Sequence, residues 1–452
     1  MFALSRLPKL RHPMQQILGL ALLAGALTSL AQPVGEVAFA HGAGVVQSPG
    51  QAPRTLGEGS PLQEGDRLIT ADDSTAIVKL RDGSRMTLRP NTEILVQKYK
   101  FQAGESGNAM VMQLLRGGFR AMTGAISKGA PDAAQVQTAN ATVFVRGTDF
   151  DARVCAADCK AESARVAEKP RLNAVQASAK LISAQGEISA VDGSQTRRKL
   201  VDGGSVYPGE TVETGAGARG VLVFRDDSRL TLGASTRFKV DSFVFDDKNP
   251  TEGRFAVSLL RGSMRALTGV IGKADKSHVG YSTPTATIGI RGTGLDLDCA
   301  AIESCSFFTW QGIIAVTQIG QTEPKILEAG QGLYVSSTEI RSLTGTTLDY
   351  LPRPDGVSVD LLQLFSSGGV SGNDAGLFVY VRDGHIEIVA AGGSLQLGRG
   401  ETGFAGNDGR VGRPETMPAF IQFDNVPLPD SSNPMLLNVL SDIGRDTSNL
   451  CR

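Results

Sequence analysis

Short apolar runs separated by turn-forming residues recur along most of the chain, and they predict β-strands. The segments 76–80 and 86–88 alternate apolar and polar residues on either side of Asp82-Gly83-Ser84, which is a strong signal for a β-hairpin. Glycine is frequent, with 54 residues, whereas aromatic residues make up only 6%. We therefore expect an all-β protein of tandem sandwich-like or jelly-roll-like modules, rich in hairpins.

The pattern occurs twice, which indicates a duplicated module. The stretch 138–148, which ends in Arg146-Gly147-Thr148, returns as 283–293, which ends in Arg291-Gly292-Thr293. Further landmarks recur in the same order at an offset of 144 or 145 residues: Gly65-Asp66 and Gly209-Glu210, Asp82-Gly83-Ser84 and Asp226-Asp227-Ser228, and Leu-Leu-Arg-Gly at 114–117 and 259–262. Two copies are too few for a solenoid, so each is expected to be a self-contained domain.

A third, partial copy lies near the C-terminus. Residues 381–404 repeat the hairpin pattern that ends the second module at 312–335, and the first module lacks such a hairpin after its cysteine pair. We expect this half-module to pack on or beside the second module. The predicted boundaries are a signal peptide at 1–40, a first module at 41–162, a linker at 163–182, a second module at 183–340, a β half-module at 341–428 and a flexible tail at 429–452.

The start of the chain predicts export to the periplasm or the cell surface. Three basic residues precede an apolar run at 17–31, whose 15 residues are fewer than the ~20 that a membrane-spanning helix needs. Ala38-Phe39-Ala40 offers a cleavage site, and Ser29-Leu30-Ala31 offers an earlier one. An uncleaved membrane anchor is the alternative. No later segment is apolar enough to span a bilayer, so the mature chain is not expected to cross a membrane.

The five cysteines form two close pairs and one leftover. Cys155 with Cys159, and Cys299 with Cys305, follow the Arg-Gly-Thr of their own module, and in an exported protein each pair predicts a local disulfide. A metal site made of all four cysteines is the rival interpretation, which the unequal spacings and separate modules disfavour. Cys451 is left as a free thiol, and no cofactor or metal is expected.

Charge argues against one class of partner. The net charge is −1, and acidic and basic residues are interspersed. A nucleic-acid-binding protein would carry a basic patch or stripe, so no nucleic-acid partner is expected.

The Arg-Gly-Thr stretches break the alternation of a strand. Val143 and Val145 share one face before Gly147, whereas the apolar residues after this glycine have the opposite parity. The apolar face stays inward only if one residue is absorbed, and the second module has the same pattern around Gly292. Gly147 and Gly292 are therefore predicted β-bulges.

A bulge would turn the arginine of the motif away from the regular ladder. We expect Arg146 and Arg291 to be partly buried and paired with acids of their own module. The candidate partners are Asp66 or Asp82 in the first module and Glu210 or Asp226 in the second. An exposed arginine that binds a carboxylate or a sugar is the alternative.

The ordered landmarks resemble the FecR domain, the periplasmic part of the ferric citrate regulator. The resemblance rests on Gly-Asp, Asp-Gly-Ser, Leu-Leu-Arg-Gly and T-x-x-A-T-x-x-x-R-G-T, and it covers both modules and weakly the half-module. It implies a domain that relays the state of an outer-membrane receptor to a sigma factor. Those regulators have a cytoplasmic anti-sigma segment, whereas only about 16 residues precede the apolar run here. Direct sigma-factor control is therefore not expected.

Together these features predict a non-catalytic binding or signal-relay module of the bacterial cell envelope, whose partner is an envelope or outer-membrane protein. A structural envelope protein without a relay role is one alternative, and a carbohydrate-active enzyme is another. After the signal peptide only His41, His278 and His385 remain, and none has a plausible catalytic partner nearby in the sequence. No enzymatic activity is expected.

Overall fold

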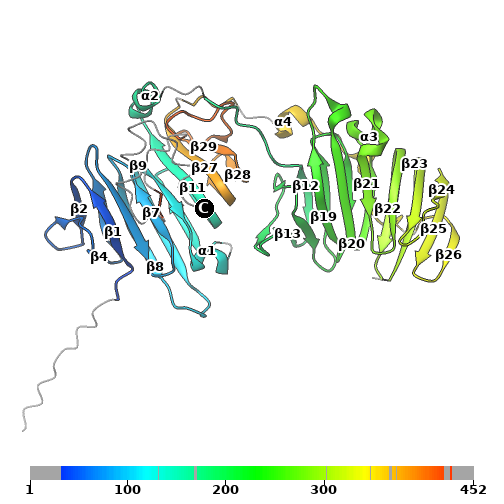
Figure 1. Cartoon of the computed structure of the whole chain (residues 1–452), viewed down its shortest axis with the longest axis horizontal. Coiled ribbons are helices and arrows are strands. Elements are labelled where there is room, and N and C mark those ends of the chain that lie inside the picture. The colour runs from blue at the N-terminus through cyan, green and yellow to red at the C-terminus, as the bar shows by residue number, and fades with distance from the viewer. Residues whose placement is uncertain are drawn as a thin grey trace, which may run out of the picture. The chain divides into compact units, whose positions relative to one another are not determined.

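Two large β-sheets form the fold in this computed structural model (Figure 1). The structure describes residues 32–130, 132–166, 170–301, 303–346, 348–365, 369–372, 374–421 and 428–429. Most of these residues lie in strands, which confirms the predicted all-β class. Within these ranges, no helix has the length and apolar character to cross a membrane. The apolar leader before residue 32, the tail from residue 430 and Cys451 lie outside the described residues.

The first sheet has 15 strands, of which the first eleven are consecutive in the chain. They are β1 (Gly35–His41), β2 (Gly44–Gln47), β3 (Arg54–Thr55), β4 (Pro61–Leu62), β5 (Arg67–Thr70), β6 (Thr75–Leu80), β7 (Arg85–Leu88), β8 (Glu93–Lys100), β9 (Ala109–Met122), β10 (Ala134–Gln137) and β11 (Ala141–Cys155). The remaining four are β27 (Gly376–Ala390), β28 (Gly393–Leu397), β29 (Thr402–Gly406) and β30 (Val411–Gly412).

The second sheet also has 15 strands, all of them consecutive. They are β12 (Ala179–Gln185), β13 (Ile188–Val191), β14 (Arg197–Lys199), β15 (Ser205–Val206), β16 (Thr211–Thr214), β17 (Arg219–Phe224), β18 (Arg229–Leu232), β19 (Arg237–Val244), β20 (Arg254–Leu267), β21 (Val279–Ser282), β22 (Ala286–Cys299), β23 (Ser304–Gln318), β24 (Lys325–Glu328), β25 (Gln331–Ser336) and β26 (Ile340–Thr344).

Short helices lie in the connections. They are α1 (Ala125–Gly129), α2 (Asp158–Ser163), α3 (Val270–Ala274) and α4 (Leu361–Phe365), with 3-10 turns η1 (Pro250–Glu252), η2 (Lys276–His278) and η3 (Pro354–Gly356).

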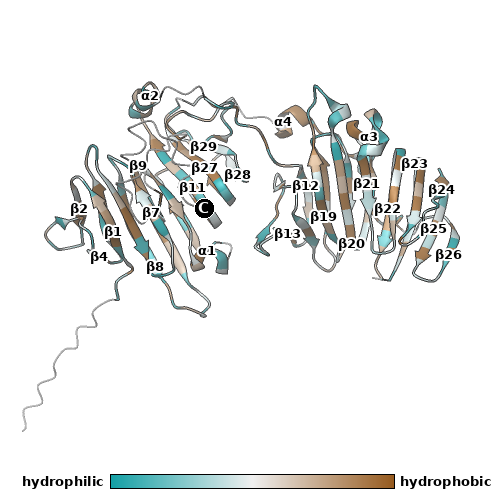
Figure 2. Cartoon of the chain, viewed as in Figure 1, coloured by the Kyte–Doolittle hydropathy of each residue, from teal (hydrophilic) through white to brown (hydrophobic). Residues whose placement is uncertain are grey.

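The duplication seen in the sequence is also a duplication of topology. The strand order β3-β2-β5-β8-β9-β10-β11-β27-β29-β30 in the first sheet matches β14-β13-β16-β19-β20-β21-β22-β23-β25-β26 in the second. Each sheet encloses its own cluster of buried apolar side chains. Along the strands apolar and polar residues alternate, as the brown and teal bands of Figure 2 show, because successive side chains point to opposite faces.

One long strand joins two layers in each sheet, and the Leu-Leu-Arg-Gly run explains how. The first half of β9 pairs with β8, and its second half pairs with β7. Gly117 lies at the break with φ of +73°, and a Cβ there would lie 2.5 Å from the carbonyl oxygen of Asn91. Gly262 holds the same position in β20 with φ of +89°. Only glycine fits this combination of conformation and close approach.

The half-module completes the first module, and the expectation that it packs on or beside the second is wrong as to its sheet. β27 pairs along its length with β11 (Figure 1), from Ala141 opposite Ala390 to Cys155 opposite Gly376. It supplies the hairpin that the first module lacks in its own segment. The second module is thus an insertion within the first. Sequence adjacency favoured the wrong neighbour, because an unpaired edge at β11 is visible only in three dimensions.

Candidate functional site

The Arg-Gly-Thr stretch forms a β-bulge in both modules, which confirms the prediction. Gly147 has φ of +59° and Gly292 has φ of +63°, left-handed values that favour glycine. The pairing of β11 with β27 changes register directly after Arg146, and the pairing of β22 with β23 does so directly after Arg291. The extra residue restores the inward apolar face, as the parity of the sequence requires.

The threonine of the motif closes the bulge. The hydroxyl of Thr148 accepts a hydrogen bond from the backbone N–H of Arg146 at 3.2 Å and donates one to the carbonyl of His385 at 3.0 Å. In the second module Thr293 makes the equivalent two bonds at 2.9 and 3.1 Å. The glycine and the threonine of the motif therefore stabilise the bulge. The side chain of the arginine takes no part in these hydrogen bonds.

A second glycine lies opposite each bulge, and sequence reasoning missed its role. Gly312 has φ of +72°, and a Cβ there would lie 2.2 Å from the carbonyl oxygen of Gly292. Gly384 has φ of +84° and is equally close, at 2.5 Å, to the carbonyl oxygen of Gly147. This role could have been predicted from the sequence, because both glycines stand at the same place in the two C-terminal hairpins.

The predicted pairing of the motif arginines is wrong in both modules. Arg146 is buried, at 6% exposure, but its Nη2 lies 3.5 Å from Asp132 and 3.7 Å from Glu387. Arg291 is exposed, and no ion pair joins it to another described residue. Both arginines keep their place in the ladder, opposite His385 and Ile313, so the bulge does not turn them away from it as predicted. Strand parity places them on the face opposite to the buried Val145 and Ile290. Asp66, Asp82, Glu210 and Asp226 are buried within the module, where other groups bind them.

Loss of the Arg146 charge is expected to have only a modest effect. Asp132 is 73% exposed on its side chain, so solvent screens its contact with Arg146. Arg146→Met should lower the free energy of unfolding by about 1 kcal/mol, and Arg291→Met should stay within about 0.5 kcal/mol of wild type. Thermal unfolding of both variants checks this. A loss of several kcal/mol in Arg146→Met would contradict this expectation and would show that the contact with Glu387 behaves as a buried ion pair.

The first acid of each module pairs instead with an arginine at the start of its module. Arg54 Nη2 lies 2.9 Å from Asp66, and Arg198 Nη2 lies 2.6 Å from Glu210. Each carboxylate also accepts a backbone N–H from three residues earlier, at 2.9 Å for Asp66 and 2.8 Å for Glu210. The two arginines are separated by the same offset as the acids, so both ion pairs could have been predicted from the repeat.

The half-module contains a third version of this turn. Glu401 is fully buried and accepts the backbone N–H of Gly398, three residues earlier, at 2.9 Å. Its arginine is Arg413, whose Nη2 lies 3.3 Å away and is itself buried. The partial third copy therefore repeats the buried acid as well as the hairpin pattern.

The second acid of each module is part of the predicted hairpin turn. Asp82 accepts hydrogen bonds from the backbone N–H of Ser84 at 3.2 Å and from its hydroxyl at 2.8 Å. Asp226 makes the same bonds with Ser228, at 3.1 and 2.9 Å. Both serines therefore stabilise turns, and neither is placed as a nucleophile.

Asp226 is expected to make the stability of the second module depend on pH. Burial raises the pKa of Asp226 to about 6, although hydrogen bonds from Ser228 act to lower it. The folded state then holds this proton more tightly than the unfolded state, whose pKa is about 3.9. The contribution of Asp226 should therefore fall by about 3 kcal/mol as the pH rises from about 4 to above 6.

Asp226→Asn isolates this term from other titrating groups. Burial acts to raise the pKa of Glu210, but the charge and hydrogen bonds of Arg198 and the backbone N–H of Tyr207 outweigh it and lower the pKa, so Glu210 has the opposite pH dependence. Urea unfolding at pH 4.5 and 7.5 can be followed by the fluorescence of Trp310, the single tryptophan. Equal pH dependence in wild type and Asp226→Asn would contradict the assignment.

Both predicted disulfides are present. Cys155 is bonded to Cys159, and Cys299 is bonded to Cys305. This overturns the four-cysteine metal site, because each pair is closed within its own module. Among the residues that the structure describes, no group of three histidine, cysteine or acidic side chains could hold a metal ion.

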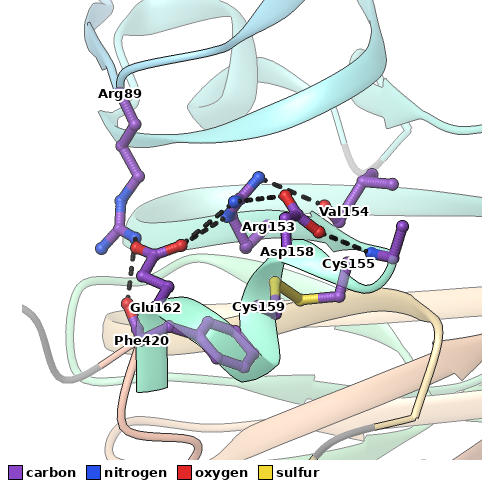
Figure 3. Close-up of a disulfide and its surroundings, with 9 residues drawn as sticks. Arg89, Arg153, Val154, Cys155, Asp158, Cys159, Glu162 and Phe420 are labelled. Atoms are coloured by element: carbon purple, nitrogen blue, oxygen red, sulfur yellow. Dashed lines mark hydrogen bonds and ion pairs between the residues drawn. A yellow bond between two sulfur atoms is a disulfide. The ribbon is translucent and has the colours of Figure 1, made fainter. Parts of the chain in front are cut away.

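The first disulfide borders a polar cluster that holds the returning C-terminal segment (Figure 3). Arg153 Nη2 donates to Asp158 at 2.7 Å and to Glu162 at 3.0 Å. Arg89 Nη1 lies 3.3 Å from Glu162 and donates to the backbone carbonyl of Phe420 at 2.9 Å. Arg89, held by Glu162 of the helix α2, thus fixes the segment around Phe420 to the first module.

Buried polar groups accumulate where the half-module meets the start of the second module. We call this set the joint: Arg198, Tyr207, Glu210, His385, Gln396 and Glu401. Arg198 donates to Gln396 at 2.7 Å, and Tyr207 donates to Glu401 at 2.8 Å. His385 Nε2 lies 3.4 Å from Glu210, and its ring packs on that of Tyr207 with centroids 4.9 Å apart.

The joint is polar, but its groups are mutually satisfied. Burial lowers the pKa of His385, although Glu210 acts to raise it, so the imidazole is uncharged at neutral pH. Burial also lowers the pKa of nearby Lys180 to about 8, with the charge of Arg413 adding to the effect. Both modules keep separate apolar cores, so the joint is a polar contact between them.

Two segments of this chain are similar to a known protein family. Residues 66–168 and 210–312 each match the family model described as FecR protein. No curated protein matches the chain. Two crystal structures of a candidate anti-sigma factor from Parabacteroides distasonis, at 2.50 and 1.65 Å resolution, are similar at 14% identity with a TM-score of 0.25. That match covers 31% of this chain and 62% of the solved chain, so less than two thirds of the length of these proteins is spanned. The chain therefore contains two tandem FecR domains, one in each module.

Proposed function

We propose that this protein is an exported, non-catalytic relay module of the bacterial cell envelope, which binds an envelope or outer-membrane protein and transmits its state between two FecR domains. The observation that carries the proposal is the joint. It connects two modules with separate cores through buried hydrogen bonds, among them those from Arg198 to Gln396 and from Tyr207 to Glu401. Polar contacts of this kind between domains permit relative motion more readily than a shared apolar core does.

The arrangement of acids also favours binding over catalysis. Asp296 and Asp298 line one small cavity of the second module, where a pair of carboxylates could in principle serve a hydrolase. Asp296 is already bound by Arg265 at 3.0 Å, Trp310 at 3.0 Å and Thr346 at 2.6 Å. These three donors occupy both carboxylate oxygens, which favours a structural role for Asp296.

Partner capture tests the relay. The full chain, cross-linked in envelope preparations, should recover one stoichiometric envelope protein. The joint variant Gln396→Leu should change that recovery at least several-fold, because it breaks the bond to Arg198, whereas Glu252→Gln in the exposed turn η1 should not. Even distribution over the envelope with no stoichiometric partner would favour the purely structural alternative.

Export has a prediction of its own, because the structure bears on the cleavage site. β1 begins at Gly35, and Val34 and Val37 are 3% and 1% exposed in the core of the first module. Cleavage after Ala40 would remove both, at about 1.5–3 kcal/mol for each buried valine. We therefore expect cleavage after Ala31, so that the signal peptide ends at residue 31 rather than at residue 40.

Mass spectrometry of the secreted protein should then give Gln32 as the first residue. Ser29→Arg should block processing, because it alters the site that ends at Ala31. Ala38→Arg should not, although it alters the later site to the same degree, and Ala38 is exposed in β1. A mature chain that begins at His41 would contradict this expectation.

A further inference from the structure

The outer face of the last strands of the second module carries an uncovered, patterned surface. Three adjacent strands, β22, β23 and β24, contribute two rows of side chains that point away from the core. One row is Gly289, Ala315 and Ile326, and the next row is Arg291, Ile313 and Glu328. We call these six residues the outer patch. Ile326 is 56% exposed and adjoins the partly exposed apolar residues Ile313 and Ala315 on β23.

Gly289 has no reason within its own chain to be glycine. Its φ is not in the left-handed range, and a Cβ at this position would meet no atom within 4 Å. The same is true of Gly280, which lies directly opposite it on β21. Glycine weakens the interior of a strand and there often marks close approach of another molecule. Because neither glycine carries a side chain, this face is open beside Ala315, and we call this open space the hollow.

The first module fills the equivalent positions with large side chains. Where the second module has Gly289, Ala315 and Ile326, the first has Phe144, Glu387 and Gln396, in the same register of β11, β27 and β28. Gln396 there contacts Arg198 at the joint. The duplicated face is thus polar, filled and covered in the first module, and apolar, hollow and exposed in the second.

We propose that the outer patch binds the same patch of a second copy of this chain, in a face-to-face dimer. A two-fold axis along β23 carries β22 of one copy onto β24 of the other. Ile326 then lies over the glycine hollow of the other copy, and the exposed Arg291 faces Glu328 of the other copy. Both pairings follow from one axis, because Gly289 and Arg291 lie one strand to one side of β23 and Ile326 and Glu328 lie one strand to the other.

Self-complementarity of this kind is what a two-fold interface requires, since each patch must fit its own copy. The projection and the hollow are equally distant from the axis, at about 4.8 Å per strand. The opposite charges share that spacing, so charge complementarity and shape select the same arrangement. The first module cannot pair in this way, because Phe144 occupies the hollow. This inference does not depend on the identity of the envelope partner.

Sedimentation of the full chain, measured over a range of concentrations, tests the dimer. Glu328→Arg should weaken association at least 10-fold, because it sets two like charges opposite each other in both symmetric pairs. The double variant Arg291→Glu with Glu328→Arg should restore dimerisation, because it exchanges the charges. Glu252→Arg, an equal change of charge outside the outer patch, should leave association unchanged.

Gly289→Phe gives an independent test, because it copies the first module into the second. It should abolish the dimer and leave the melting temperature close to wild type, since the new side chain points into open space. A protein that is monomeric at all concentrations would overturn the proposal. A dimer that survives both Glu328→Arg and Gly289→Phe would overturn it equally, because association would then use another surface.

Discussion

A chain that ends at residue 365 is expected to lose the fold of its first module and to keep that of its second. This change removes β27 to β30, and β27 is the strand that pairs with the outer side of β11 in the described structure. It also removes six large apolar side chains from the first core: Leu377, Val379, Val381, Ile386, Ile388 and Leu397. At about 1.5–3 kcal/mol for each buried side chain, the loss equals or exceeds the ~5–15 kcal/mol that holds a typical domain folded.

Two probes separate the modules in this experiment. Trp310 lies in β23, so its fluorescence should still report a cooperative unfolding transition of the second module. The backbone amides of β11 and β9 should lose their protection against hydrogen exchange. A chain that ends at residue 429 is the control and should keep both modules. Retained protection of β11 in the shorter chain would contradict the insertion of one module within the other.

The second large effect is expected at the buried ion pair of the second module. Arg198 and Glu210 are 5% and 3% exposed, and the guanidinium binds both carboxylate oxygens, at 3.1 and 2.6 Å. Arg198→Met should lower the free energy of unfolding by about 3–5 kcal/mol, because a buried carboxylate is left without its counter-charge. Urea denaturation followed by Trp310 fluorescence measures this loss.

The duplication supplies the matched control. Arg54→Met breaks the equivalent pair of the first module, but Arg54 is 32% exposed on its side chain and Asp66 keeps bonds from Ser48 at 2.6 Å and Gln63 at 2.9 Å. Its cost should be smaller, about 1.5 kcal/mol. The double variant Arg198→Met with Glu210→Gln should be more stable than Arg198→Met alone. A double variant no better than the single would refute the charge argument.

The sequence was sufficient where structure follows from local pattern. The bulges at Gly147 and Gly292 were predictable because side-chain parity along a strand has a period of two, and a glycine stood at the break. The turns at Asp82 and Asp226 and both disulfides were also predictable, because the partners lie within a few residues of each other in the sequence.

It was insufficient where a partner lies far along the chain. Parity places Arg146 on a face but does not say which acid lies across that face, and its neighbour Glu387 comes from β27. The pairing of β27 with β11 likewise depends on an open edge that no local pattern records. The arginines Arg54 and Arg198 could have been found, because the repeat offset aligns them as it aligns Asp66 with Glu210.

The insertion also sets an order of events during synthesis. β11 emerges long before β27, and the whole of the second module is made in between. The second module has all its strands once β26 is complete, whereas the first waits for nearly the end of translation. A chain threaded across a membrane from its N-terminus would therefore finish its first domain last. Factors that shield nascent strands would be needed most at β11.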